Sequence, residues 1–268
     1  MPSRFLRKSR CSVALLEVND LFRSFGGLRA VDQVSFTVPN GMIKGIIGPN
    51  GAGKTTLFNL IAGSLVAESG TIFFDGRPVS GLPPHRIAAR GIARTYQNVK
   101  IFRQMTVLEN VMVGCHQRSR GGFLAGMLRL PFTVREERRV RARSLELLEM
   151  LGLPEVADQD ASALAFGRQR SVELARALAL EPRLILLDEP AAGLNIRETV
   201  QLAQTVRSIR DLGITVLIVE HDMSLIMDIS DEIVVLDFGR KIAEGTAQQV
   251  RRDPEVIRVY LGDEDAEG

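Results

Sequence analysis

The sequence predicts an α/β fold with a parallel-sheet core, an antiparallel β subdomain near the N-terminus and a helical subdomain inserted into the core. Alternating apolar and polar residues up to position 40 indicate the antiparallel strands. Three later apolar runs are typical of buried parallel strands, and the amphipathic segment between the last two is typical of a crossover helix. The runs are GMIKGII at 41–47, RLILLDEP at 183–190 and GITVLIVEHD at 213–222.

Helical periodicity between the first two runs predicts the inserted subdomain. In the segment VREERRVRARSLELLEMLGLP, Leu145, Leu148 and Leu151 share one stripe of a helix, and the charged residues lie on the opposite side. We therefore expect these leucines to face the core and the arginines to face solvent.

Composition excludes several classes of protein. Of the 268 residues, 45% are hydrophobic, and the 34 Lys and Arg against 32 Asp and Glu give a net charge of +2, which does not favour nucleic acid as the main partner. The two cysteines, Cys11 and Cys115, form no metal-binding spacing and are normal for a reducing compartment, so we expect the cytoplasm. No apolar run approaches the roughly 18 residues of a membrane span.

The octapeptide GPNGAGKT follows the first apolar run and fits the P-loop pattern at every fixed position. Its glycines let backbone N–H groups point at phosphate oxygens, and Lys54 is expected to reach the β- and γ-phosphates. Thr55 offers a hydroxyl to Mg²⁺. We therefore expect a P-loop NTPase core of the RecA-like type that binds nucleotide through Gly48, Pro49, Asn50, Gly51, Ala52, Gly53, Lys54, Thr55 and Thr56.

Two adjacent acids, Asp188 and Glu189, end the second apolar run. Burying such acids is costly unless a cation or a proton transfer needs them. Asp188 is expected to hold Mg²⁺ through water, and Glu189 to polarise the water that attacks the γ-phosphate. The alternative is a helix N-cap followed by first-turn charge.

Further motifs resemble the ATPase subunit of an ABC transporter over residues 13–262. They are Gln97 in ARTYQNVKIF, His221 in LIVEHD and the segment LAFGRQR at 164–170. The segments SFGGLRAVDQVSFTV, DEPAAGLN and AEGTAQQVRRDPEVIRVYLG look more narrowly like the ATP-binding subunit of branched-chain amino acid importers of the Liv type.

The resemblance implies a single ABC nucleotide-binding domain that uses ATP and Mg²⁺. Its expected parts are an N-terminal extension at 1–12, antiparallel β at 13–40 and flanking strands, the ATPase core at 41–97 and 183–250, the helical subdomain with the signature motif at 98–182, and an acidic tail at 263–268.

The resemblance also implies roles for residues around the nucleotide. Gln97 corresponds to a glutamine that contacts Mg²⁺ and the attacking water, with a plain polar strand end as the alternative. His221 corresponds to a histidine that contacts the γ-phosphate, with a structural histidine as the alternative. Phe25 is a candidate to stack on adenine, with a core aromatic as the alternative. Asn195 matches the loop at the interface of two heads. The implied catalytic residues are Glu189, His221 and Gln97, and the implied metal ligands are Thr55, Gln97 and Asp188.

The signature helix departs from the family pattern. Family members usually carry Ser where this chain has Ala165 and Gln where it has Arg168, while Phe166 suits the Liv type. The resemblance implies that Gly167 approaches the γ-phosphate of ATP held by a partner head. Ala165 lacks a hydroxyl that would cap the helix and touch phosphate, and Arg168 brings a cation toward the same place.

The resemblance implies several partners. We expect a second ATPase head, with a heterodimer favoured, and membrane-spanning permease subunits docked on Gln97–Gln104, where Ile101 and Phe102 are either anchors or subdomain core. A periplasmic or extracellular solute-binding protein acts indirectly. The subunit is expected to be peripheral, on the cytoplasmic face of the inner or plasma membrane, and to bind no nucleic acid.

The function implied is ATP hydrolysis that powers uptake of branched-chain or related amino acids. Three alternatives stay open from the sequence: an importer head for urea or another small polar solute, a lipid or lipopolysaccharide exporter head, and a soluble ABC ATPase that is not coupled to transport.

Overall fold

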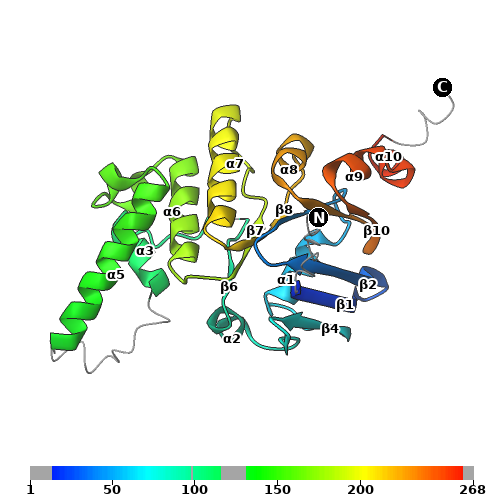
Figure 1. Ribbon diagram of the computed structural model, residues 1–268, viewed down its shortest axis with the longest axis horizontal. Coiled ribbons are helices and arrows are strands. Elements are labelled where there is room, and N and C mark those ends of the chain that lie inside the picture. The colour runs from blue at the N-terminus through cyan, green and yellow to red at the C-terminus, as the bar shows by residue number, and fades with distance from the viewer. Residues whose placement is uncertain (1–13, 98, 116–130, 262–268) are drawn as a thin grey trace, which may run out of the picture.

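The computed structural model describes residues 14–97, 99–115 and 131–261, and consists of two sheets with helices around them (Figure 1). The predicted extension at 1–12 and acidic tail at 263–268 lie outside the described residues. In Figure 1 the helices of the inserted segment gather at one end, the antiparallel sheet lies toward the other, and the parallel sheet lies between them.

The antiparallel sheet has four strands in the order β2-β1-β4-β5. The alternating pattern of its first two strands buries Leu16, Val18, Val34 and Val38 completely, which explains the sequence alternation. The strands are β1 (Ala14–Phe25), β2 (Leu28–Pro39), β4 (Ser69–Phe74) and β5 (Arg77–Pro78).

The second sheet has six strands in the order β10-β9-β3-β8-β7-β6, of which β10 pairs antiparallel to β9 and the other pairs are parallel. Every residue of β3, β7 and β8 is buried, which explains why these strands are mostly apolar; the buried charged residues among them are Lys44 and Asp188. The strands are β3 (Ile43–Ile47), β6 (Ile92–Arg94), β7 (Leu184–Asp188), β8 (Thr215–Val219), β9 (Glu232–Asp237) and β10 (Arg240–Gly245).

Helices cover both faces of the parallel sheet. They are α1 (Lys54–Ile61), α2 (Pro84–Ala89), α3 (Val107–Cys115), α5 (Pro131–Met150), α6 (Phe166–Leu178), α7 (Ile196–Asp211), α8 (Met223–Ile229), α9 (Ala247–Arg252) and α10 (Pro254–Leu261), with 3₁₀ turns η2 (Pro154–Val156) and η3 (Ala161–Ala163).

Two hydrophobic clusters show which elements pack on each face. Ile185 and Leu187 of β7 contact the cluster that includes the helices of the inserted segment. Leu184 and Leu186 of the same strand join the cluster around α1 and the antiparallel sheet. The predicted fold class, an α/β core with an antiparallel β part and inserted helices, is confirmed.

The predicted leucine stripe on α5 is wrong at one position. Leu148 is fully buried, but Leu145 is 37% exposed and Leu147 is buried in its place. Three-residue steps drift around a helix of 3.6 residues per turn, so the buried face alternates steps of three and four. Among the helices in the described part of the chain, none is both long and apolar enough to cross a membrane.

Candidate active site

The P-loop runs from the end of β3 to α1. At two of its glycines the backbone lies very close to the backbone of neighbouring segments. Gly48 has φ +155°, and a Cβ there would lie 2.2 Å from the carbonyl oxygen of Leu236. Gly53 has φ +96°, and a Cβ there would lie 2.1 Å from the carbonyl oxygen of Ala30. Glycine is therefore required at both positions by conformation and by space.

The ammonium of Lys54 lies inside the curve of this loop. Its Nζ donates hydrogen bonds of 2.7 Å and 2.9 Å to the carbonyl oxygens of Gly48 and Pro49. Burial lowers the pKa of Lys54, and the charges of Glu189 and Asp188 act in the opposite direction. The lysine thus lies within electrostatic reach of both predicted acids.

Helix α1 begins directly after the loop without a side-chain cap on its N-terminal amides. By contrast, Asn195, Asp222 and Thr246 cap α7, α8 and α9 with their own side chains. The uncapped backbone N–H groups of α1 and the ammonium of Lys54 are hydrogen-bond donors in one place. Such a group of donors is suited to binding a phosphate. The hydroxyls of Thr55 and Thr56 belong to this first turn.

The predicted acid pair lies at the carboxyl end of β7. Asp188 is buried, and its carboxylate accepts a hydrogen bond of 2.8 Å from Arg94 on β6. Arg94 also donates a hydrogen bond of 2.7 Å to the side chain of Asn59 on α1. Arg94 was not predicted, because its partner acid is far away in the sequence and no local pattern marks the pair.

Glu189 follows with a left-handed backbone, φ +46°, which is strained for a residue with a side chain. Its carboxylate accepts a hydrogen bond of 2.8 Å from the side-chain amide of Gln97. The structure therefore places near one another Lys54, Asp188 and Glu189, predicted from motifs, and Gln97, predicted from the family resemblance.

His221 follows β8 at the same sheet edge, beside an acid that the sequence analysis missed. Glu220 is fully buried and accepts hydrogen bonds of 2.6 Å from the amide of Ala191 and 3.2 Å from that of His221. Burial raises the pKa of Glu220, while these amides act to lower it. The His221 side chain is 59% exposed, and its Nδ1 lies 3.9 Å from the Glu220 carboxylate.

Helix α6 carries the signature residues, and its N-cap Ala165 makes no side-chain capping bond. A Cβ on Gly167 would lie 2.6 Å from the carboxylate of Glu198 on α7, so a side chain at that position would displace this carboxylate. Arg168 pairs with Glu155 of the same chain at 3.1 Å. In this structure the guanidinium therefore binds a neighbouring acid.

Phe25 and Asn195, two further predicted residues, differ in their surroundings. The ring of Phe25, at the end of β1, is 45% exposed, with the guanidinium of Arg23 at 5.0 Å from its centre. Asn195 forms a capping box with Glu198 at the start of α7. The side-chain oxygen of Asn195 is therefore engaged in holding this helix terminus.

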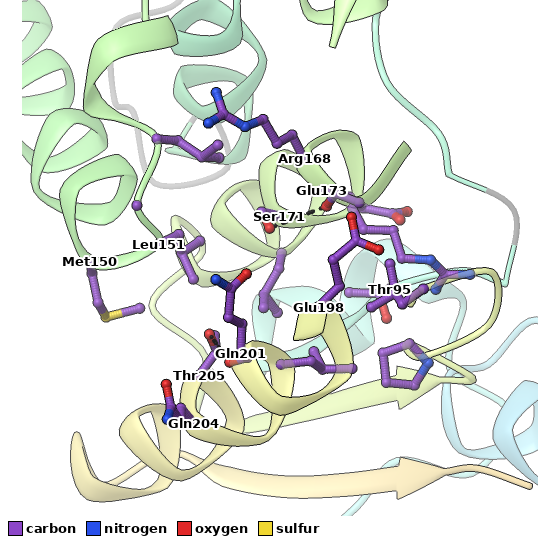
Figure 2. Close-up of a pocket in the computed structure, with 18 of the residues that line it drawn as sticks. Thr95, Met150, Leu151, Arg168, Ser171, Glu173, Glu198, Gln201, Gln204 and Thr205 are labelled. Atoms are coloured by element: carbon purple, nitrogen blue, oxygen red, sulfur yellow. Dashed lines mark hydrogen bonds between the residues drawn. The ribbon is translucent and has the colours of Figure 1, made fainter. Parts of the chain in front are cut away.

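A cavity of about 510 Å³ that is partly open to solvent lies between α6 and α7. Ser171 and Glu173 border it from α6, and Glu198, Gln201 and Thr205 border it from α7 (Figure 2). The two helices are therefore separated by open space over part of their facing surfaces.

The fold and this site define a P-loop nucleotide-binding protein. The family profile described as "ABC transporter" matches residues 31–192, and the profile described as "Branched-chain amino acid ATP-binding cassette transporter" matches residues 240–266. The chain belongs to the ABC transporter family, as an ATP-binding subunit with transport ATPase activity.

Curated relatives match over nearly their whole length. The high-affinity branched-chain amino acid transport ATP-binding protein BraF of Pseudomonas aeruginosa is 45% identical over 250 residues, 93% of this chain and 98% of that protein. The corresponding protein LivG of Escherichia coli is 44% identical over 253 residues, 94% of this chain and 99% of that protein. The predicted resemblance to the Liv type is confirmed.

Solved structures have the same fold. The ADP conformation of MJ1267, an ATP-binding cassette of an ABC transporter, has a TM-score of 0.81 and 33% identity, and the match covers 94% of this chain and 100% of that chain. The dimeric structure of MJ0796, a bacterial ABC transporter cassette, has a TM-score of 0.74 and 25% identity, covering 87% and 98%.

Proposed function

We propose that this chain is the ATP-hydrolysing subunit of an importer for branched-chain or related amino acids. The observation that carries the catalytic part is that Glu189, which directly follows the buried Asp188, accepts a hydrogen bond of 2.8 Å from the side chain of Gln97. The substrate class is supported by the relatives named for branched-chain amino acid transport and by the profile match at 240–266.

In this proposal the residues Gly48–Thr56 hold the phosphates of ATP. Backbone amides and Lys54 supply positive charge, and the exposed ring of Phe25 supplies a stacking surface for adenine. Mg²⁺ prefers hard oxygen donors as ligands. In this proposal the donors are the buried carboxylate of Asp188, the hydroxyl of Thr55 and the amide oxygen of Gln97. When bound, Mg²⁺ neutralises charge on the phosphates.

Glu189 acts as the base toward the attacking water. Its hydrogen bond with Gln97 holds the carboxylate in one orientation, and His221 follows β8 at the same edge, where its exposed imidazole can reach the γ-phosphate. General-base assistance of this kind contributes roughly 10²- to 10⁴-fold to a rate.

A second ATPase head completes the site. The uncapped N-terminus of α6 offers free amides to the ATP held by that head, with Gly167 allowing close approach. The dimer of the related cassette MJ0796 supports such pairing. Because Ala165 adds no hydroxyl and Arg168 is drawn to Glu155, we propose a heterodimer with one weaker site and Asn195 near the interface.

The permease subunits dock on the segment that follows Gln97. Phe102 and Met105 are exposed there, and Ile101 is partly buried against the core. The guanidinium of Arg176 on α6 lies 5.3 Å from the Phe102 ring centre, so an apolar partner covering Phe102 would contact a surface backed by the signature helix. The subunit is then peripheral on the cytoplasmic membrane face.

The test is transport by the complete complex, reconstituted in vesicles with the second ATPase, the permease and the solute-binding protein. Leucine should enter the vesicles in an ATP-dependent manner, and urea should not. Uptake of urea alone would assign the small-polar-solute alternative. Extraction of lipid or lipopolysaccharide without any solute uptake would assign an exporter head, and either result would overturn the amino acid proposal.

A further inference from the structure

Arg170 of the signature helix connects two residues of the hydrolysis site through their backbones. Its Nη1 donates a hydrogen bond of 2.9 Å to the carbonyl oxygen of Glu189. Its Nη2 donates a hydrogen bond of 3.1 Å to the carbonyl oxygen of Gln97. One guanidinium therefore binds both residues of the side-chain pair in which Gln97 donates to Glu189.

The charge of Arg170 is held among acids. Burial lowers its pKa, and the charges of Glu173, Glu220, Glu189 and Asp188 act in the opposite direction. The planar guanidinium can donate along two directions at a fixed angle, which lets it serve two carbonyls at once. A lysine ammonium is a single point of charge and lacks this fork.

Arg170 also contacts another residue of the signature segment, Phe166. The Arg170 guanidinium lies 5.3 Å from the ring centre of Phe166, and this ring packs against Gly193, where a Cβ would lie 3.1 Å from it. Arg170 and Phe166 lie about one helical turn apart on α6, so they move together as parts of one element.

The cavity between α6 and α7 leaves part of the facing surfaces of these helices unpacked, so the hydrogen bonds of Arg170 matter more for the position of α6. Where packed side chains fill an interface, they resist relative movement of the two elements. Here about 510 Å³ of open space separates part of the two helices (Figure 2). The hydrogen bonds of Arg170 therefore form a direct link from α6 to the backbone of Glu189, whose φ of +46° needs restraint from its surroundings.

We propose that Arg170 is a positioning residue that transmits the position of the signature helix to Glu189 and Gln97. It fixes the two carbonyl groups relative to each other, and so sets the direction of the Glu189 carboxylate. When a partner head's nucleotide displaces α6, Arg170 shifts the base with it. This inference rests on the proposed function, in which Glu189 is the base and Gln97 its partner.

The test compares Arg170→Met and Arg170→Lys with Arg207→Met in the assembled transporter. Arg207 on α7 is a matched control, because it donates to the carbonyl oxygen of Asp228 at 3.0 Å away from the site. The measurements are kcat for ATP hydrolysis and, separately, the Kd of a fluorescent ATP analogue. Arg170→Met should lower kcat at least tenfold and leave Kd within threefold, because the P-loop is untouched.

Arg170→Lys should recover part of kcat, since it can reach one carbonyl, and Arg207→Met should resemble the wild type. In a Glu189→Gln background, Arg170→Met should change the residual rate by less than threefold, because the base is already absent. Wild-type kcat in Arg170→Met, or equal changes in kcat and Kd, would overturn the inference. If Glu189→Gln itself hydrolysed ATP normally, the proposed function would fail instead.

Discussion

The side-chain amide of Gln97 donates a hydrogen bond of 2.8 Å to the carboxylate of Glu189. Gln97 precedes the segment on which permease subunits are proposed to dock, and Glu189 is the proposed base. In the proposed function, a movement of the docking segment reaches Glu189 through this side-chain contact and also through the hydrogen bonds of Arg170 to both carbonyl oxygens.

Replacement of Gln97 by Ala removes this contact and leaves the P-loop intact. We expect ATP turnover of the assembled transporter to fall about tenfold, the effect of a hydrogen bond to a charged group, with nucleotide affinity nearly unchanged. Steady-state kinetics and nucleotide titration measure the two quantities. The exposed Gln204 on α7 gives a control, and equal loss in Gln204→Ala would contradict a specific role for Gln97.

Replacement of Ala165 by Ser should supply the missing cap of α6. An N-cap serine stabilises a helix by about 1 kcal/mol relative to alanine, so the free energy of unfolding should rise by about this amount. Urea denaturation measures the change, with Ala163→Ser in the preceding turn as a control. The same variant should strengthen ATP-dependent association with the partner head, and no change in either quantity would show that the uncapped start of α6 is of no consequence.

Asp222 should make stability depend on pH. Its carboxylate caps α8, and hydrogen bonds from the Ser224 side chain and from the Ser224 and Leu225 amides lower its pKa, with a smaller effect of His221. A lowered carboxyl pKa stabilises the fold above the unfolded-state pKa, and this contribution is lost as the pH falls through the folded-state pKa.

Asp222→Ala should therefore cost about 1 kcal/mol at pH 7, and the difference from wild type should shrink as the solution is acidified. Asp222→Asn keeps the capping oxygen without the charge and should show no such pH dependence. Urea denaturation of the three proteins across pH 3–7 checks this. A difference that grows on acidification would contradict the sign.

Phe102 is the exposed aromatic side chain of the proposed docking segment. Truncation to Ala should weaken co-purification with the permease by at least tenfold, since an aromatic anchor in an interface typically contributes about 2 kcal/mol. Leu212, exposed beyond the end of α7, serves as the control for loss of a surface apolar group. Undiminished permease binding by Phe102→Ala would place the docking surface elsewhere.

Local sequence patterns predicted those features whose functional residues are neighbours in the sequence. GPNGAGKT identifies its loop because glycines, lysine and threonine must occur together, and the acid pair is visible because it ends an apolar strand. Burial on both faces made β3, β7 and β8 readable as strands.

Long-range pairing could not be predicted. Nothing near Arg94 indicates Asp188 as its partner, and Arg170 appears in the sequence only as the last residue of the segment LAFGRQR, where nothing indicates that it contacts Glu189. Asn195 was predicted from the family resemblance alone, and its capping box appears only once the start of α7 is known. A single sequence contains the residue types at these positions, whereas the contacts depend on the complete fold.

The most direct test of coupling between ATP hydrolysis and transport is the rate of ATP turnover. It is measured for this subunit alone and then together with its partner ATPase and the permease. Both measurements are repeated with the Glu189→Gln variant. Turnover should rise at least tenfold with the partners and fall at least 100-fold with Glu189→Gln, within the range of general-base catalysis. Fast turnover by the isolated subunit that does not respond to the partners would contradict coupling and indicate an ATPase that works independently of transport.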